Sequence, residues 1–446
     1  MSSITKTITL EINKPIDVTW DKLSEVLKVL RNQTRIIMNK TMQLMWEFDN
    51  FSSEYKSSYG IFPKDKEILS TSDGNAVTIA GYVYDRLKNQ HIMYSANASQ
   101  SQQKAIKKWK ADQKDVRNGL KSIASFKENL PIELHNKSIA LIRDNKGYVA
   151  EIKLLNKDGI TKFETTSSSL NLNIKAKDPS TKIVLNRLIS GEYKIGGSQI
   201  IQRKKKWFLA VSYTFETKQL QDFSKENILG IDMGIVYPVY MAVNNSLARE
   251  KIEGGEIEHF RKKVEKHRIS LLRQGKYAGK GRTGHGRATK LKPINVLSEK
   301  VSNFRNTANY KYAKFVVEFA IKNNCGIIQM EDLSGIGKND SRFLKNWSYY
   351  DLQLKIMNKA KENGIEVRKI DPKYTSQRCS CCGYIIEENR PKEEKGQAYF
   401  KCIQCGFDSN ADYNAAKNIA TKNIEKIIQD QIKLQKQKLV HFKKYA

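Results

Sequence analysis

The chain has 446 residues, enough for a sizeable hydrophobic core and roughly two to four domains. Its 78 Lys and Arg residues against 47 Asp and Glu residues give a net charge of +31, which favours a polyanionic partner such as nucleic acid. With no apolar run of eighteen residues, no signal peptide and no lipidation motif, we expect a soluble cytoplasmic protein without a membrane partner.

The first half of the chain predicts a β domain interrupted by a helical block. Residues 4–12 alternate as a strand does and end before Pro15, and short alternating runs return between residues 125 and 216. We expect these runs to form the hairpins of a small barrel or sandwich that the first strand joins. Apolar residues at helical spacing predict further helices near 19–48, 76–94, 102–122 and 181–189.

A buried strand with one acid follows in the sequence ILGIDMGIVYPVYMAV, which begins at Ile228. An ionised carboxylate in an apolar strand is unfavourable unless it is hydrogen-bonded, paired or bound to a metal ion, so Asp232 needs a partner. A metal ion is the sharpest explanation, and a strand-end acid that caps a turn is the alternative.

Residues 261–292 contain twelve Lys or Arg residues and a single acid, with glycines that argue against a continuous helix. We expect a disordered loop or one that tracks phosphates, and a solvated surface is the alternative. A helix is predicted over 301–321.

A second buried strand, CGIIQME, ends in Glu331. Side-chain alternation places Glu331 and its neighbour Asp332 on opposite faces, and we favour Glu331 as the functional acid. Later segments predict a helix over 349–363, the strand GIEVRKI, and a basic helical tail from residue 421 onward.

All six cysteines lie at or after Cys325, and five of them cluster in one segment, which is typical of metal binding in a reducing compartment. Cys379 and Cys382 form one C-x2-C pair, and Cys402 and Cys405 form a second pair after nineteen intervening residues. This spacing suits one zinc ion held by four thiolates, and Cys381 is then spare. Glycines directly follow both pairs, where a tight turn needs a left-handed backbone. A ribbon with only a structural role is the alternative.

Asp412 opens a helix of small residues seven positions after Cys405. An acid on a first strand, an acid ending a later strand and an acid opening a closing helix follow the order of carboxylates in RNase H-like nucleases. Such a site uses Asp232, Glu331 and Asp412 to hold two magnesium ions that hydrolyse a phosphodiester. The histidines are scattered, and no Ser/His or Cys/His nucleophile is evident.

Four motifs resemble the split RuvC nuclease domain and zinc ribbon of type V CRISPR nucleases and their TnpB relatives: GIDMG, QMEDL, the two cysteine pairs, and NADYNAAKNIA. The segments GGEIEHFRKKVEKHRISLLRQGKYAG and SRFLKNWSYYDLQ are similar to the miniature subtype V-F effectors, the Cas12f family. The resemblance covers nearly the whole chain. Some members carry a further cysteine/histidine zinc site near the N-terminus, and we do not carry that site over to this chain because no cysteine precedes Cys325.

The resemblance implies a multidomain α+β protein that is an RNA-guided, magnesium-dependent DNA endonuclease. It implies a β-barrel wedge domain with an inserted helical recognition domain, then an RNase H-like RuvC domain with an inserted zinc ribbon. The implied boundaries are 1–18 and 124–222 for the wedge, 19–123 for recognition, 223–371 and 408–446 for RuvC, and 372–407 for the ribbon, which would be the target-nucleic-acid-binding module. Its partners would be a guide RNA, a target DNA with a T-rich flanking motif, and a second copy of the chain on the same guide RNA.

Two alternatives remain open. A transposon-encoded TnpB-like nuclease would use the same chemistry, and a nucleic-acid-binding protein without cleavage would keep the ribbon for structure. The intact set of three acids argues against the second alternative.

Overall fold

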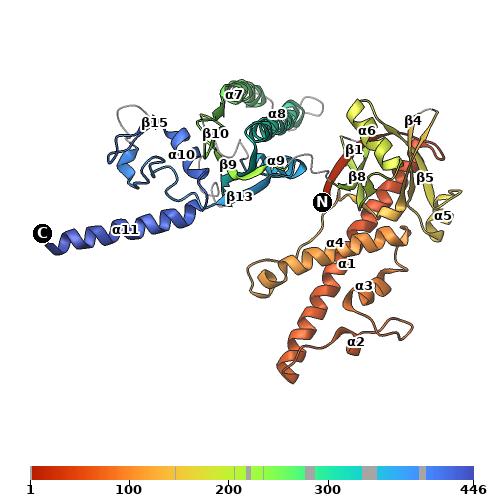
Figure 1. Ribbon diagram of the computed structural model, residues 1–446. Coiled ribbons are helices and arrows are strands. Elements are labelled where there is room, and N and C mark those ends of the chain that lie inside the picture. The colour runs from red at the N-terminus through yellow and green to blue at the C-terminus, as the bar shows by residue number, and fades with distance from the viewer. Residues whose placement is uncertain are drawn as a thin grey trace. The chain divides into compact units, whose positions relative to one another are not determined.

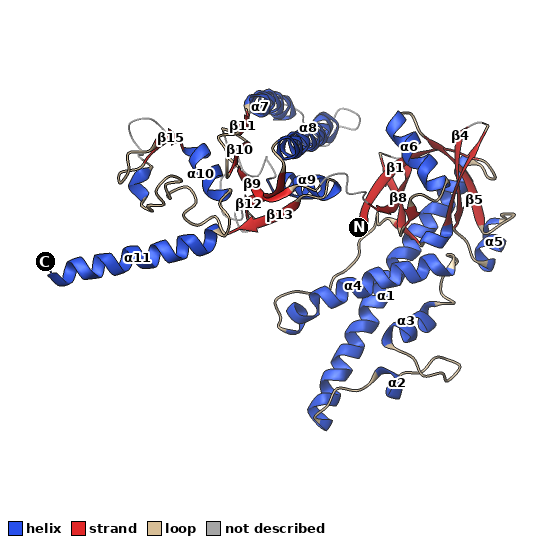
Figure 2. Ribbon diagram, viewed as in Figure 1, coloured by secondary structure: helices blue, strands red, loops and turns tan. Residues whose placement is uncertain are grey.

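The computed structural model describes residues 3–145, 147–204, 206–216, 222–234, 236–276, 287–333, 349–390 and 398–445. The chain divides into two compact units, Ser2–Glu216 and Thr217–Ala446, each with its own hydrophobic core. Figure 1 shows the elements in chain order and Figure 2 shows their secondary structure. Within the described residues, none of the helices is long and apolar enough to cross a membrane.

The first unit contains an eight-stranded sheet with the order β2-β7-β8-β1-β5-β4-β3, and β6 pairs with β8 outside this path. Every recorded pairing in it is antiparallel. The strands are β1 (Ser3–Pro15), β2 (Ile132–Leu134), β3 (Ile139–Asp144), β4 (Gly147–Lys153), β5 (Ser169–Lys175), β6 (Lys194–Ile195), β7 (Ser198–Arg203) and β8 (Lys206–Glu216).

The first strand joins this later sheet, as predicted, because β1 pairs with both β5 and β8. Its predicted end was wrong, since β1 continues to Pro15 opposite Leu172. The pairing with β5 shifts register between Ile12 and Lys14, and proline is tolerated at such an irregular strand end.

The helical block predicted between β1 and the remaining strands is present. Its helices are α1 (Trp20–Tyr59), α2 (Asp65–Ile68), α3 (Ile79–Leu87) and α4 (Ser95–Arg117), and the sheet region adds α5 (Lys157–Phe163) and α6 (Pro179–Ile189). The prediction ended α1 too early, because the helix continues through polar turns without a buried apolar stripe, where serine hydroxyls bond to carbonyl oxygens one turn earlier, and ends only at Gly60, which has a left-handed backbone. It also missed α5, a short helix capped by Asn156.

The second unit is built on a five-stranded sheet with the order β11-β10-β9-β12-β13. Its strands are β9 (Ser224–Asp232), β10 (Val239–Val243), β11 (Arg249–Ile252), β12 (Cys325–Glu331) and β13 (Glu366–Ile370). β9, β12 and β13 are mutually parallel, whereas β9, β10 and β11 form an antiparallel meander. A small two-stranded sheet pairs β14 (Tyr399–Lys401) with β15 (Asp408–Asn410).

The helices of the second unit are α7 (Gly255–Lys276), α8 (Arg287–Lys322), α9 (Tyr349–Glu362), α10 (Ala411–Ile419) and α11 (Ile424–Tyr445). The loop predicted over 261–292 was wrong where it can be compared, because α7 continues to Lys276 and α8 already begins at Arg287. The physical reason is that no glycine occurs between residues 261 and 274, where Val264 and Leu271 recur at helical spacing. Residues 277–286 lie outside the described residues.

The central sheet of the second unit is covered on both faces. Leu229 and Ile231 of β9 pack in the core formed with α8 and α9. On the other face, Tyr240 and Ala242 of β10 pack against Ala416 of α10. The side chains that point toward α10 therefore come from alternate positions of the strands, and these positions carry the acids discussed next.

Candidate functional site

Asp232 ends β9 on the face of the sheet that α10 covers. Gly230, two residues earlier on that face, allows α10 to pack directly on the strand, because a Cβ there would overlap backbone atoms of Ala416 and Ala420. Burial raises the pKa of Asp232 to about 8, with further contributions from the charges of other acids. This carboxyl group therefore keeps its proton near pH 7 unless a cation approaches it.

Glu331 ends β12, which runs parallel to β9 with Met330 opposite Ile231. The two acids therefore lie at the same edge of the sheet. Gln329, two residues before Glu331, donates its side-chain N–H to the carbonyl oxygen of Ile419 at 2.8 Å, so this face of β12 points toward α10. Asp332 instead lies beyond the strand, within 3.6 Å of Lys369 Nζ. Burial raises the pKa of Glu331 despite a hydrogen bond from a threonine hydroxyl.

Asp412 lies in the first turn of α10, and Asn410 caps this helix. The Asn410 Oδ1 atom accepts the backbone N–H of Asp412 at 3.0 Å. Burial raises the pKa of the Asp412 carboxyl. Lys417 fixes the same helix to the turn after β10, because its partly buried Nζ donates to three carbonyl oxygens, those of Val243, Asn244 and Ser246, at 2.8, 2.9 and 2.9 Å.

The three predicted acids are coupled electrostatically in the structure. Burial is the largest cause of the raised pKa of Asp232, and the negative charges of Glu331 and Asp412 raise it further. Carboxylate oxygens are the ligands that hard cations such as Mg²⁺ prefer. The three side chains therefore offer the type of ligand atom that magnesium binds. A cluster of partly buried acids also needs positive charge before all its members can ionise.

Sequence reasoning missed two residues of this site. The positive charge of Arg390 lowers the pKa of both Asp232 and Asp412 and so partly offsets the effect of their burial. The hydroxyl of Tyr349 donates to the carbonyl oxygen of Gly234 at 2.8 Å, and burial followed by the charge of Asp232 raises its pKa to about 12. Neither residue could be identified from the spacing of a sequence motif, since the two lie in different parts of the chain from the acids.

The four cysteines predicted as zinc ligands form a compact cluster. The Sγ atoms of Cys379, Cys382, Cys402 and Cys405 all lie within 4.8 Å of one another. The Cys379–Cys405 and Cys382–Cys402 sulfur atoms are 3.7 and 3.5 Å apart, close to the roughly 3.8 Å between sulfurs around a tetrahedral zinc ion with Zn–S bonds of about 2.3 Å. Cys381 is exposed and outside the cluster, as predicted.

The backbone around the cysteines has the turn geometry that the sequence predicted. Gly383 and Gly406 follow the second cysteine of each pair with φ of +80° and +72°. Each glycine N–H donates to the carbonyl oxygen of the first cysteine of its pair, at 2.9 Å in both turns. Burial raises the pKa of the Cys382 thiol to about 12, whereas the backbone N–H of Phe407 lowers that of Cys405 to about 7. A bound cation is therefore needed for all four thiolates to coexist.

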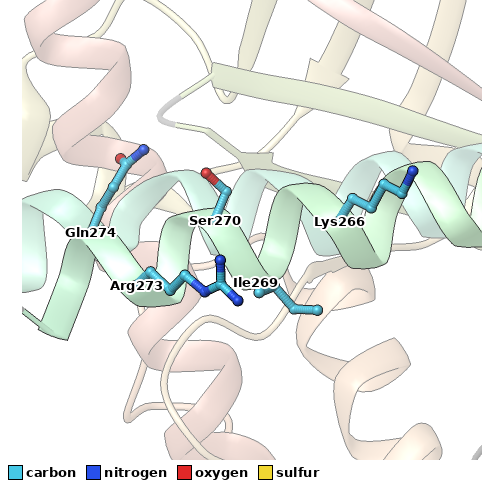
Figure 3. Close-up of a pocket in the computed structure, with 5 residues that line it drawn as sticks. All are labelled: Lys266, Ile269, Ser270, Arg273 and Gln274. Carbon is cyan, nitrogen blue, oxygen red and sulfur yellow. The ribbon is translucent and has the colours of Figure 1, made fainter.

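The basic helix α7 has an exposed face with a surface pocket lined by Lys266, Ile269, Ser270, Arg273 and Gln274. Lys266, Ser270 and Gln274 follow one another at intervals of four residues and form a row along the helix (Figure 3). Two cationic side chains beside hydroxyl and amide groups suit contacts with phosphates better than binding of an apolar ligand.

The sequence matches the family described as Cas12f1-like, TNB domain, over residues 349–419. This span includes the four clustered cysteines, the helix α9 and the helix α10, whose first turn contains Asp412. The matched region is therefore wider than the ribbon itself.

Two curated proteins are similar over most of their length. The CRISPR-associated endodeoxyribonuclease Cas12f1 of Sulfoacidibacillus thermotolerans is 46% identical over 435 residues, which cover 95% of this chain and 98% of that protein. The protein of the same name from Syntrophomonas palmitatica is 38% identical, with 84% of this chain and 81% of that protein covered. Among solved structures, a cryo-EM structure of a Cas12f1-sgRNA-target DNA complex has a similar fold, with a TM-score of 0.72, 24% identity, and coverage of 94% of this chain and 99% of that one.

Proposed function

The chain belongs to the Cas12f1 family of CRISPR-associated endodeoxyribonucleases, and on that premise we propose that it is an RNA-guided DNA endonuclease whose active site contains Asp232, Glu331 and Asp412. The observation that carries the assignment of the site is the convergence of these acids at one edge of the central sheet. The pKa of Asp232, about 8, reflects its burial and its proximity to both other acids.

The topology of the second unit supports an RNase H-like nuclease fold. Three antiparallel strands followed by two parallel strands, in the order 3-2-1-4-5, give the sheet of that fold. Its first and fourth strands end in Asp232 and Glu331. We assign 223–371 and 408–446 to this RuvC domain, with the ribbon 372–407 inserted. The sheet and the helical block of the first unit correspond to the proposed wedge, 1–18 and 124–222, and recognition domain, 19–123.

In the proposed mechanism, magnesium held by three carboxylates would supply Lewis-acid chemistry, namely activation of a water molecule and stabilisation of the leaving oxygen of a DNA phosphodiester. The side chains of Asp232, Glu331 and Asp412 provide the oxygen ligands. Arg390 adds positive charge beside Asp232 and Asp412, which favours their ionised forms and complements a phosphate. Packing of α10 on β9 and the Lys417 hydrogen bonds keep Asp412 at the edge of the sheet.

The ribbon is proposed to bind zinc through its four clustered cysteines and to serve as the target-nucleic-acid-binding module. Asn389 joins the two cysteine-containing parts of the ribbon. Its side chain donates to the carbonyl oxygen of Gln377 and accepts the backbone N–H of Ile403, at 3.0 and 3.1 Å. The adjacent Arg390 is thereby carried by the ribbon and placed near the acids. Zinc binding and the nuclease site therefore share one supporting structure.

The proposed partners are a guide RNA and a target DNA whose T-rich flanking motif the protein reads directly. Guide pairing would supply the remaining specificity, and a single RuvC site would cut both strands in turn. The net charge of +31 and the cationic face of α7 suit contacts with two nucleic acids.

We further propose that two copies assemble on one guide RNA. A compact chain of this length has a radius of gyration of roughly 22 Å, whereas a heteroduplex of about 20 base pairs approaches 60 Å. One chain is therefore short of contact surface. Light scattering of the purified complex tests this proposal, and a mass of one chain per guide in an active complex would refute it.

The function is tested by purifying the protein, sequencing the RNA that accompanies it, and supplying a DNA that matches the guide. We expect Mg²⁺-dependent cleavage of the matched DNA and none of a scrambled DNA. Cleavage without RNA, or no cleavage under any flanking sequence, would contradict the proposal. The similarity to CRISPR-associated nucleases over 95% of the chain favours this reading over a TnpB-like transposon nuclease. A CRISPR array beside the gene would separate the two, since a transposon nuclease would lie between transposon ends.

A further inference from the structure

Thr375 is a buried residue with 1% of its surface exposed, in the loop between β13 and the first cysteine pair. Its Oγ1 atom lies 2.6 Å from Oε1 of Glu331 and 2.9 Å from the carbonyl oxygen of Pro372. A hydroxyl group carries one proton, so the two acceptors compete for it. The carboxylate is the stronger acceptor, and the shorter distance is the one to Glu331.

The backbone holds Thr375 in place. The preceding residue, Tyr374, has φ of +65°, a left-handed conformation that is uncommon for a residue with a bulky side chain. Its carbonyl oxygen accepts the backbone N–H groups of Gln377 and Arg378, at 3.1 and 2.9 Å. A strained residue persists only where its surroundings determine the conformation, so the position of the Thr375 hydroxyl is fixed by the fold.

Helix α10 is hydrogen-bonded to the same loop. Asn418 donates its side-chain N–H to the carbonyl oxygens of Thr375 and Arg378, at 2.9 and 2.7 Å. Asn414, two residues after Asp412, donates to the carbonyl oxygen of Arg378 at 2.8 Å. Both asparagines are fully buried. The loop is therefore tied to the helix that carries Asp412, and through Thr375 to the acid on β12.

We propose that Thr375 is a positioning residue for Glu331: its hydroxyl holds one carboxylate oxygen and so orients the group for binding a divalent cation. The inference rests on the proposed role of Glu331 as a magnesium ligand. Partners of metal-binding carboxylates commonly act in this way, and their removal weakens metal binding about 10- to 100-fold. The alternative is a threonine that only stabilises its own loop.

Thr375→Val tests the proposal, because valine keeps the shape of threonine and removes the hydroxyl, and Thr375→Ser should restore the function. Thr421→Val is the matched control, since the Thr421 hydroxyl also makes one hydrogen bond in this unit, to the carbonyl oxygen of Lys417 at 3.1 Å. The full chain is titrated with Mn²⁺ and free Mn²⁺ is measured by electron paramagnetic resonance. Cleavage by the guide complex is then measured against Mg²⁺ concentration.

We expect Thr375→Val to weaken Mn²⁺ binding about 10-fold or more and to raise the Mg²⁺ midpoint of cleavage by a similar factor. Saturating Mg²⁺ should restore the cleavage rate to within a few-fold of wild type, because the chemistry itself is unchanged. Thr375→Ser and Thr421→Val should stay within about threefold of wild type in both measurements, since each keeps the hydroxyl at position 375. Zinc content should stay the same in all variants.

Wild-type Mn²⁺ binding and Mg²⁺ midpoint in Thr375→Val would overturn the proposal, as would equal losses in Thr375→Val and Thr421→Val. If the valine variant fails to fold, Thr375→Ala is read in the same way. Glu331→Gln distinguishes failure of the proposed active site from failure of the proposed role of Thr375. Full cleavage by Glu331→Gln would contradict the proposed active site, whereas an inactive Glu331→Gln beside a normal Thr375→Val would overturn only the role of Thr375.

Discussion

The cysteine cluster and the carboxylate cluster lie in the same unit and are built in opposite ways. The cysteine ligands come from two tight turns within one short segment, and their sulfur atoms gather within 4.8 Å. The acids come from two strands and a helix that are separated by up to 180 residues along the chain. Among the described residues, only the cysteines form so compact a group of metal ligands.

The difference teaches how each site depends on the fold. The cysteines lie in local turns that form only when the ribbon folds, so we expect zinc binding and folding of the ribbon to be coupled. The acids converge only after the sheet, α10 and the loop at Thr375 have packed, and their raised pKa values reflect burial of carboxyl groups in that packed core. A wider arrangement of carboxylates suits ions that arrive together with a phosphate, as in two-metal hydrolysis.

The largest expected effect comes from removing one acid. Asp232→Ala, Glu331→Ala or Asp412→Ala should each reduce DNA cleavage about 10³-fold or more, because magnesium ligation contributes several kcal/mol to transition-state stabilisation. Binding of guide and target should survive, since little packing surface is lost. Cleavage assays and gel-shift binding measure the two effects.

Matched controls are available for two of these acids. Asp332→Ala removes the neighbour of Glu331, and Asp408→Ala removes an exposed acid that accepts a hydrogen bond from Tyr399. Both controls should keep cleaving DNA. An inactive Asp408→Ala beside a normal Asp412→Ala would show that the third ligand is assigned wrongly.

The next largest effect should come from removing two of the four cysteines of the cluster. Cys402→Ser/Cys405→Ser should lose the one zinc ion per chain that we expect, and the ribbon with it. Cleavage should then fall by at least about tenfold, because the ribbon carries Arg390 and is bonded to α10 through Asn414. Elemental analysis and cleavage assays provide the measurements.

Cys381→Ser is the matched control for the zinc site, since this cysteine lies outside the cluster. It should keep its zinc and its activity. Full zinc content in the Cys402→Ser/Cys405→Ser variant would contradict the four-thiolate site.

The same contrast explains what the sequence could predict. The zinc ligands follow from spacing alone, because their geometry is local. Alternation along CGIIQME correctly placed Glu331 on the face of Gln329, whose side chain bonds to the end of α10. The contacts of Thr375 and Arg390 could not be predicted, since they depend on how a loop and a hairpin pack against distant strands. The glycines after residue 274 led to a predicted loop where α7 is helical.

A smaller effect should appear in the pH dependence of metal binding. With its folded pKa near 8, above the value of about 4 for an unfolded chain, Asp232 binds more protons in the folded state. Its burial therefore lowers stability as pH rises from about 4 to 8 in the absence of metal. Below pH 8, Mg²⁺ must displace this proton, so Mg²⁺ affinity should rise by up to about tenfold per pH unit.

Thermal unfolding with and without Mg²⁺, between pH 6 and 9, measures this linkage. The Mg²⁺-dependent increase in Tm should grow with pH in the wild type and become nearly independent of pH in Asp232→Asn. Zinc retention should not change across this range. An increase in Tm that does not depend on pH in the wild type would contradict a protonated Asp232 in the metal-free protein.

The smallest effect should come from cations that belong to neither metal site. Lys266→Gln/Arg273→Gln removes two charges from the exposed face of α7 (Figure 3), where they would contact phosphates. Each lost contact should reduce the slope of log K against log salt by about 0.9, so affinity should fall several-fold at low salt and less at high salt.

Lys311→Gln/Lys314→Gln makes the same charge change on α8, but these lysines lie within 3.4 and 3.5 Å of Glu256 and Glu318. Equal slopes for both variants would mean that α7 contributes only general charge, and an unchanged slope would mean that its cationic face is merely solvated.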